Sequence, residues 1–218
     1  MAISLIFDMD GTLFQTDKIL EISLEAAFDY LRSRDEWTKG TPIEKYREIM
    51  GATLPVVWET LMPDHSDAVR ETANDFFQKH LIATIHNGKG ALYPHVYELF
   101  EYLKQAGCSI YIASNGAIEY LQAIVSHYKL DAWVTETFSI QQIDSLDKAD
   151  LVSVILRKYN IEHAAVVGDR LTDINAAKKN GLLAIGCRFD FAQEDELRQA
   201  DVTINDLLEL KELLLKRP

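Results

Sequence analysis

Short apolar stretches recur along the chain, and each ends in small or polar residues. Four of them predict buried strands, at residues 3–7, 108–113, 164–167 and 182–185. Apolar residues at helical spacing predict helices over 94–105, 117–128, 151–159 and 172–179. Strands that alternate with helices over short connections are typical of a parallel sheet with helices on both faces. The pattern therefore predicts an α/β fold, in which ligands bind beyond the carboxyl ends of the strands.

Residues 16–85 interrupt this alternation. Two long amphipathic segments, 18–32 and 66–81, predict helices, and nothing in the stretch predicts a strand. Because the stretch follows the first strand directly, we expect an all-helical insertion over the strand ends, where inserted elements govern selectivity. The chain then divides into a core of residues 1–15 and 86–218 and an inserted unit of residues 16–85. The alternative is that the insertion forms part of one larger core.

Composition and charge narrow the class of protein. Of the 218 residues, 48% are hydrophobic and 26% are charged, which indicates a soluble globular protein. The 34 acidic and 22 basic side chains give a formal net charge of −12, which disfavours binding to nucleic acid or to an anionic membrane surface. The first residues lack the basic region of a signal peptide, and no apolar run approaches the roughly 18 residues of a membrane span. We therefore expect a cytoplasmic protein.

Two aspartates follow the first predicted strand, in the sequence Asp8-Met9-Asp10-Gly11-Thr12. Side chains of an extended chain alternate, so Asp8 and Asp10 are expected to face the same side. Two carboxylates at close range repel each other unless a cation, a proton or hydrogen bonds offset the repulsion. When the two groups are stabilised in different ways, they can take different chemical roles. A turn that caps the next helix explains one of the aspartates but not both.

A second carboxylate pair lies in Gly168-Asp169-Arg170-Leu171-Thr172-Asp173, after another predicted strand. Asp173 falls in the first turn of a predicted helix, where capping alone explains an anion. Asp169 has no such explanation. Several carboxylates at one edge of a sheet favour a hard divalent cation, and Mg2+ suits a site of few carboxylates and a phosphate oxygen.

Two further segments carry candidate ligands for an anion. Ser114-Asn115-Gly116 follows the second strand and precedes a helix, so hydroxyl, amide and N–H groups can gather around an anion there; helix capping is the alternative. Lys148 lies at the positive end of a predicted helix. That unfavourable position indicates an anionic neighbour, although a lysine at a helix start is usually solvated.

In this order the motifs resemble those of the haloacid dehalogenase (HAD) superfamily of phosphohydrolases. Asp8-x-Asp10-Gly11-Thr12 is similar to the first motif of the family, Ser114 to the second, Lys148 to the third and Gly168-Asp169-x-x-x-Asp173 to the fourth. The helical insertion resembles the C1-type cap of phosphoglycolate phosphatase and β-phosphoglucomutase relatives. The resemblance implies a Rossmann-like core and Mg2+-dependent hydrolysis of a small phosphorylated metabolite by a monomer or weak dimer.

The resemblance also implies a role for each motif residue. Asp8 is the nucleophile that forms an aspartyl-phosphate, and Asp10 is the general acid and base. Mg2+ is held by Asp8, the main-chain carbonyl of Asp10 and Asp169, with Asp173 in support. Ser114 and Lys148 hold the phosphoryl oxygens. The remaining substrate-binding positions are Gly11, Thr12, Asn115 and Gly116.

Some residues bear on the choice within the family. Asp10 argues against a dehalogenase, and Thr12 favours a phosphatase over a sugar phosphomutase, which remains the alternative together with a non-catalytic phosphate sensor. Ala149 stands where many relatives have proline, which weakens the assignment of Lys148. Residues 49–54 resemble the specificity loop of the cap, and Arg47 just before it is a candidate for a substrate anion or a solvated helix residue. Trp37 and Trp58 are expected in the core of the insertion.

Overall fold

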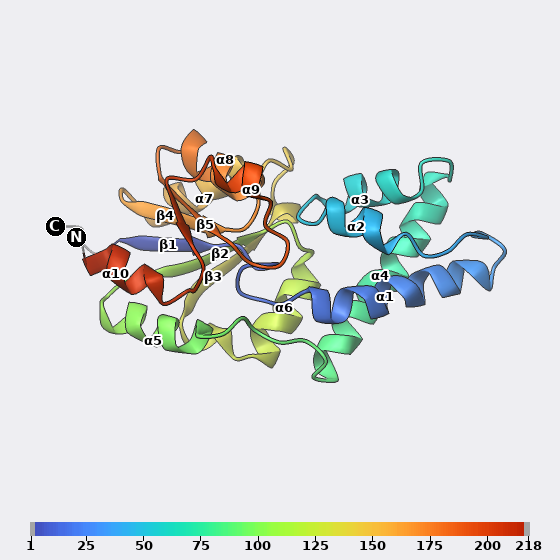
Figure 1. Cartoon of the computed structure of the whole chain (residues 1–218), viewed down its shortest axis with the longest axis horizontal. Helices are drawn as coiled ribbons and strands as arrows, with labels where there is room; N and C mark the ends of the chain where they lie inside the picture. The colour runs from blue at the N-terminus through green and yellow to red at the C-terminus, as the bar shows by residue number, and fades with distance from the viewer. Residues whose placement is uncertain (1–2, 216–218) are drawn as a thin grey trace.

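The sheet has six parallel strands in the order β3-β2-β1-β4-β5-β6 (Figure 1). They are seen in a computed structural model that describes residues 3–215, so residues 1–2 and 216–218, which the sequence assigned to the core, lie outside the described residues. The strands are β1 (Ser4–Phe7), β2 (Ile110–Ser114), β3 (Val134–Ser139), β4 (Ala164–Gly168), β5 (Leu183–Cys187) and β6 (Val202–Ile204). Every residue of β1, β2 and β4 is buried, as expected for strands covered on both faces.

Helices cover both faces of this sheet, and α5 and α7 lie on opposite sides of it (Figure 1). The helices are α5 (Val96–Gln105), α6 (Ile118–His127), α7 (Lys148–Tyr159), α8 (Leu171–Lys179), α9 (Glu194–Leu197) and α10 (Glu209–Leu215). Along β1, Phe7 packs in one hydrophobic cluster with Phe100 of α5, whereas Ile6 packs in a second cluster with Val152 of α7. This alternation confirms the predicted α/β fold. Among residues 3–215, no helix is long and apolar enough to cross a membrane.

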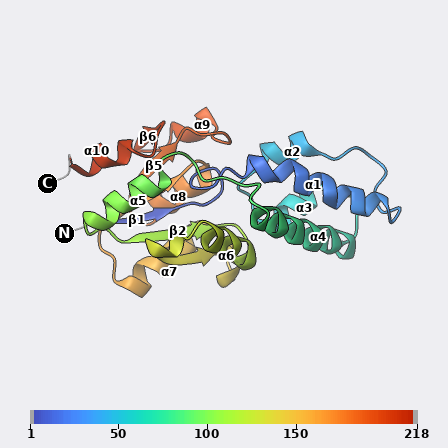
Figure 2. The ribbon, with the colours of Figure 1, turned by 90° about the horizontal axis from the view of Figure 1, so that it is seen from below.

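Residues 17–86 form four helices and contain no strand, as the sequence predicted. They are α1 (Asp17–Arg32), α2 (Ile43–Glu48), α3 (Leu54–Leu61) and α4 (Asp67–His86). In two perpendicular views they occupy one end of the molecule, beyond the strands (Figures 1 and 2). The ring of Phe28 lies 4.7 Å from that of Trp37 and 6.2 Å from that of Trp58 between ring centroids. Both tryptophans are buried, so the expectation for them is confirmed.

The apolar residues of these four helices are continuous with those of the sheet. One hydrophobic cluster extends from Phe7 and Phe100 to Leu24 of α1 and Phe77 of α4, and α4 packs against α6. Packing therefore joins the insertion to the core, as the alternative of one larger core requires. The path of the chain, in contrast, sets residues 17–86 apart as one continuous segment. The division into a core and a cap stays a prediction.

The strands β3 and β6 were not predicted from the sequence. Both lie at the edges of the sheet. In β3, Val134–Ser139, only Phe138 and Ser139 are buried, and β6 has three residues. An edge strand leaves one side uncovered, so its sequence does not need the apolar run by which central strands are recognised.

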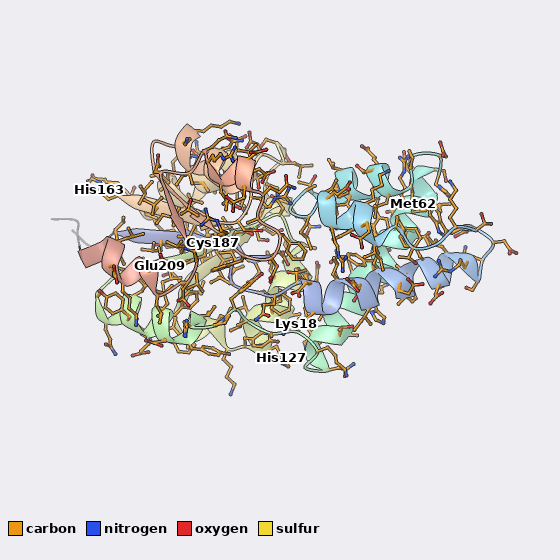
Figure 3. All side chains as sticks on the ribbon, in the orientation of Figure 1. Lys18, Met62, His127, His163, Cys187 and Glu209 are labelled. Carbon is orange, nitrogen blue, oxygen red and sulfur yellow. The ribbon has the colours of Figure 1, made fainter. Side chains whose placement is uncertain are left out.

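The two ends of the sheet differ in what surrounds them. Figure 3 shows His163, next to the start of β4, at the end of the molecule opposite Met62, which follows α3. The start of β1 and the end of α10 also lie at the His163 end (Figure 1). The carboxyl ends of the strands therefore face the helices α1–α4.

Candidate active site

A cavity of about 60 Å3 lies between the carboxyl ends of the strands and the helices α1–α4. Most of the predicted site residues line it, namely Asp8, Asp10, Ser114, Asn115, Gly116, Lys148 and Asp173. Three others, Gly11, Thr12 and Asp169, lie outside this lining. Thr12 and Asp169 are fully buried, and the Thr12 hydroxyl donates a hydrogen bond of 3.2 Å to Asp169 Oδ1. Thr12 thus contacts the predicted metal ligand and not the cavity.

The first motif continues the central strand and then turns. The Asp8 N–H donates to the Val167 carbonyl at 2.8 Å, which extends the pairing between β1 and β4 by one residue. Met9 is buried in the hydrophobic cluster, and its carbonyl accepts from the N–H groups of Leu13 and Phe14. Asp8 and Asp10 line the cavity while Met9 faces the core, as the alternation predicted.

Asp169 packs closely against the first motif. Gly11 has a φ of +78°, and a Cβ atom at this position would lie 2.5 Å from Asp169 Oδ2, so only glycine fits. Asp169 Oδ2 itself is buried and has no hydrogen-bond partner among the described residues. A buried carboxylate oxygen without a partner is costly, because it has lost its hydration.

Lys148 is the first residue of α7 and is buried. Asp147 caps this helix by accepting a hydrogen bond of 2.9 Å from the Ala149 N–H. The Lys148 ammonium forms ion pairs with Asp8 and, at 2.5 Å, with Asp173. The expectation that an anion holds Lys148 at the positive end of a helix is therefore confirmed, and Ala149 in place of proline does not prevent it.

Three carboxylates lie close together next to the single positive charge of Lys148. Oxygen atoms of Asp8, Asp169 and Asp173 lie within 4.8 Å of one another. Burial raises the pKa of Asp8 and Asp169, and repulsion from neighbouring carboxylates adds to it, whereas Lys148 opposes it. For Lys148, burial lowers the pKa, but Asp173 and Asp8 outweigh burial and raise it. The lysine therefore stays charged and compensates only part of the negative charge.

These residues fit a hard divalent cation. The three carboxylates offer oxygen ligands, and one of these oxygens, Asp169 Oδ2, lacks a hydrogen bond. Oxygen donors and excess negative charge are what Mg2+ and Ca2+ sites require. The geometry thus supports a divalent metal at this point without selecting one.

Asp10 is held by two residues that the sequence analysis did not identify. Thr16 and Tyr120 each donate a hydrogen bond of 2.5 Å to Asp10 Oδ1. Burial raises the pKa of Asp10, and these two hydrogen bonds oppose part of that effect. Tyr120 is buried and lies four residues before Ile124, on the same face of α6. A tyrosine on the buried face of a helix that follows a strand end was the available signal. Thr16 precedes α1 and makes no capping hydrogen bond.

The segment Ser114-Asn115-Gly116 forms hydrogen bonds within itself and with the insertion. Ser114 is buried at the end of β2, and its hydroxyl oxygen accepts a hydrogen bond of 3.0 Å from the Gly116 N–H. The Asn115 amide donates at 2.7 Å to the Gly51 carbonyl, in the loop between α2 and α3. The Asn115 side chain therefore connects the end of β2 to the insertion, and its role in binding an anion stays a prediction.

Two arginines differ in their relation to the cavity. Arg47 was a candidate for a substrate anion or a solvated helix residue. It pairs with Glu21 and with Glu44 at the surface and does not line the cavity, which agrees with the second alternative. Arg170, which was not singled out, lines the cavity and contacts both the Met50 carbonyl and Glu196, the latter at 2.9 Å. Arg170 immediately precedes α8 and therefore lies, like Lys148, at the positive end of a helix. A cation in that unfavourable position indicates an anionic neighbour, so the sequence contained a signal for Arg170 as well.

Comparison with known proteins places the chain in a family. A sequence profile of the haloacid dehalogenase-like hydrolases matches residues 5–187. A 5'-nucleotidase from Pseudomonas aeruginosa is 24% identical over 224 residues, which cover 97% of this chain and 95% of that protein. A phosphoglycolate phosphatase from Vibrio vulnificus is also 24% identical, with 96% and 94% covered. A solved structure, a predicted phosphoglycolate phosphatase from Haemophilus somnus, aligns with a TM-score of 0.85 at 19% identity over 97% of each chain.

The family assignment agrees with the motifs and with the fold. The profile extends over all four motifs, and the six-stranded parallel sheet has the same fold as the solved structures. The prediction of a phosphoric monoester hydrolase of this superfamily is thereby confirmed at the level of the enzyme class. The chain belongs to the haloacid dehalogenase-like hydrolase family.

Proposed function

We propose that the protein is a Mg2+-dependent phosphatase that hydrolyses a small phosphomonoester through an aspartyl-phosphate on Asp8. The observation that carries the proposal is the convergence of Asp8, Asp10, Lys148 and Asp173 on one cavity, with Asp169 directly behind them. A nucleophile, an acid, a cation and metal ligands are the groups that phosphoryl transfer requires.

Asp8 and Asp10 share the chemistry of two half-reactions. In the first, an Asp8 oxygen attacks phosphorus, the bond to the leaving oxygen breaks, and Asp10 gives that oxygen a proton. In the second, Asp10 removes a proton from water, the water oxygen attacks phosphorus, and Asp8 leaves as a free carboxylate. Burial, which raises the pKa of Asp10, favours the protonated form that the first half-reaction needs.

Lys148 and Ser114 are proposed to hold the transferred group. The Lys148 ammonium is buried against Asp8, so it lies where negative charge accumulates on the phosphoryl oxygens. The Ser114 hydroxyl lines the same cavity. Mg2+ at Asp8 and Asp169, with Asp173 in support, would neutralise charge between the nucleophile and the phosphate.

Two observations favour a phosphatase over the other readings of the sequence. A sugar phosphomutase passes through a bisphosphate and must hold a second phosphate away from Asp8, but the cationic side chains among the described residues that line the cavity are Lys148 and Arg170, both already paired. A phosphate sensor does not need an acid, yet Asp10 is held by Thr16 and Tyr120 beside the nucleophile. We also propose a cytoplasmic location, in keeping with small metabolites as substrates.

The test is the release of inorganic phosphate from a panel of phosphomonoesters, with Mg2+ or with a chelator. We expect metal-dependent release by the wild type, a loss of at least about a thousandfold in Asp8→Asn, and a large loss in Asp10→Asn. Asp131→Asn, an exposed aspartate outside the site, is the matched control and should keep full activity. Release that persists in Asp8→Asn would contradict the assignment of the nucleophile. Isomerised sugar phosphate without phosphate release would indicate the mutase.

A further inference from the structure

The cavity has two walls of different chemistry. The sheet side carries the aspartates and Lys148, whereas the side formed by the insertion is mainly apolar. The apolar residues of that side are Leu20, Tyr46, Met50, Leu54, Phe77 and Leu81. Because the phosphoryl group must lie next to Asp8, the rest of the substrate faces this apolar wall.

Among the described residues that line the cavity, none from the insertion carries a positive charge. Arg170 belongs to the sheet side and is occupied by Glu196 and the Met50 carbonyl. Arg47, the nearest candidate in the insertion, pairs with two glutamates at the surface. A carboxylate or second phosphate on the leaving group would therefore be buried without a partner, which strongly disfavours binding.

Gln78 brings an amide group to this mainly apolar wall. It follows Phe77 on α4, lines the cavity, and its Oε1 atom is buried without a hydrogen-bond partner among the described residues. Asn115 Oδ1, from the sheet side of the same cavity, is in the same state. Two buried acceptors without donors match a ligand that brings hydroxyl groups.

The size of the cavity limits the leaving group further. The cavity has a volume of about 60 Å3, which favours a phosphoryl group with a small leaving group. A leaving group as bulky as a nucleoside fits this space less readily than a chain of a few heavy atoms.

We propose that the substrate is a small phosphomonoester with an uncharged, hydroxylated leaving group, whose hydroxyl donates to Gln78 Oε1 while its carbon chain contacts the apolar wall. This inference rests on the proposed phosphatase activity and adds to it the class of substrate. It makes Gln78 a specificity-determining residue, because it contacts the leaving group and not the reacting atoms.

A pair of substrates with equal chain length tests the charge of the leaving group. Glycerol 3-phosphate and 3-phosphoglycerate differ by a hydroxymethyl group against a carboxylate, and adenosine 5'-monophosphate tests size. We expect kcat/KM for glycerol 3-phosphate to exceed that for 3-phosphoglycerate by at least about a hundredfold, the cost of an unpaired buried charge. Equal or higher values for 3-phosphoglycerate or for adenosine 5'-monophosphate would overturn the proposal.

A second experiment tests Gln78 itself. Gln78→Leu should lower kcat/KM for glycerol 3-phosphate about tenfold, mainly through KM, since it removes one hydrogen bond in a buried site. Propyl phosphate, which lacks the hydroxyls, should be hydrolysed equally by the variant and the wild type. Gln105→Leu on the exposed side of α5 is the control. An equal loss on both substrates would show a structural role of Gln78 and refute its assignment.

Binding to Asp8→Asn separates the failure of this inference from the failure of the proposed function. Calorimetry with glycerol 3-phosphate and 3-phosphoglycerate ranks the two leaving groups without turnover. If Asp8→Asn binds glycerol 3-phosphate more tightly than 3-phosphoglycerate but the wild type releases no phosphate, the proposed function is refuted and the class of ligand is supported. Turnover with the opposite preference would refute the class of substrate alone. No binding of either compound would refute the class of substrate, whereas the proposed function is decided separately by phosphate release from the panel.

Discussion

Replacing Gly11 by alanine measures how closely the first motif is built against Asp169. A Cβ atom at Gly11 would lie 2.5 Å from Asp169 Oδ2 and 2.8 Å from Asp169 Cγ, and the backbone there has a φ of +78°. The left-handed backbone costs about 1 kcal/mol for a residue with a side chain. Displacing a fully buried side chain costs about 1–3 kcal/mol more. We therefore expect Gly11→Ala to lower the free energy of unfolding by about 2–4 kcal/mol.

Gly107 provides the matched control. Its φ is +74°, and a Cβ atom there would have no heavy atom within 4 Å. Gly107→Ala should therefore show the backbone cost alone, about 1 kcal/mol. The difference between the two variants isolates the contact with Asp169.

The assay is thermal unfolding followed by circular dichroism, in the presence of a chelator, together with phosphate release in Mg2+. For a chain of this length 1 kcal/mol corresponds to about 2–4 °C, so the Tm should fall by about 3 °C in Gly107→Ala and by about 6–12 °C in Gly11→Ala. Phosphate release should survive in Gly107→Ala and be lost in Gly11→Ala, because Asp169 is displaced. Equal shifts of Tm in the two variants would refute the reasoning.

Three further predictions concern the surroundings of the site. Arg170→Ala should raise KM severalfold with little change in kcat, because it removes the contact that holds the Met50 carbonyl, in the loop between α2 and α3, against the sheet side of the cavity. Arg198→Ala, which breaks an exposed ion pair, is the control, and an unchanged KM in Arg170→Ala would contradict the prediction. Tyr120→Phe should move the basic limb of the pH–rate profile to higher pH, because losing a hydrogen bond to the carboxylate raises the pKa of the acid Asp10; a downward shift would contradict it. Mg2+ should raise the Tm of the wild type but not of Asp169→Asn, since binding to the folded state alone stabilises it; equal gains would exclude Asp169 as a ligand.

The central strands could be predicted from the sequence because they are buried on both faces of the sheet. The strands β1, β2 and β4 are continuous apolar runs, and the insertion was visible as a long stretch of helical periodicity. The edge strands were missed for the opposite reason. In β3, polar residues such as the exposed Thr135 interrupt the apolar run, and the strand depends on pairing with Ile110–Ser114 of β2. Pairing between strands is a tertiary property that local pattern does not contain.

Part of the candidate site could also be predicted from the sequence. Asp8, Asp10 and Lys148 could be placed together because each stands at a strand end or helix start, and the ends of parallel strands meet at one edge. The contacts of Asn115 and Arg170 with the loop at Gly51 and Met50 depend on how the insertion folds over the sheet. No spacing within the chain encodes that contact, since its partners are more than sixty residues apart.

The position of the chain ends has a practical consequence. The start of β1 and the end of α10 lie at the end of the sheet that faces away from the cavity (Figure 1). A tether, fluorophore or affinity handle attached next to the start of β1 or the end of α10 is therefore attached far from the cavity and from Asp8. Attachment of the protein to a surface through its ends should leave catalysis intact, so single molecules can be observed while they turn over substrate.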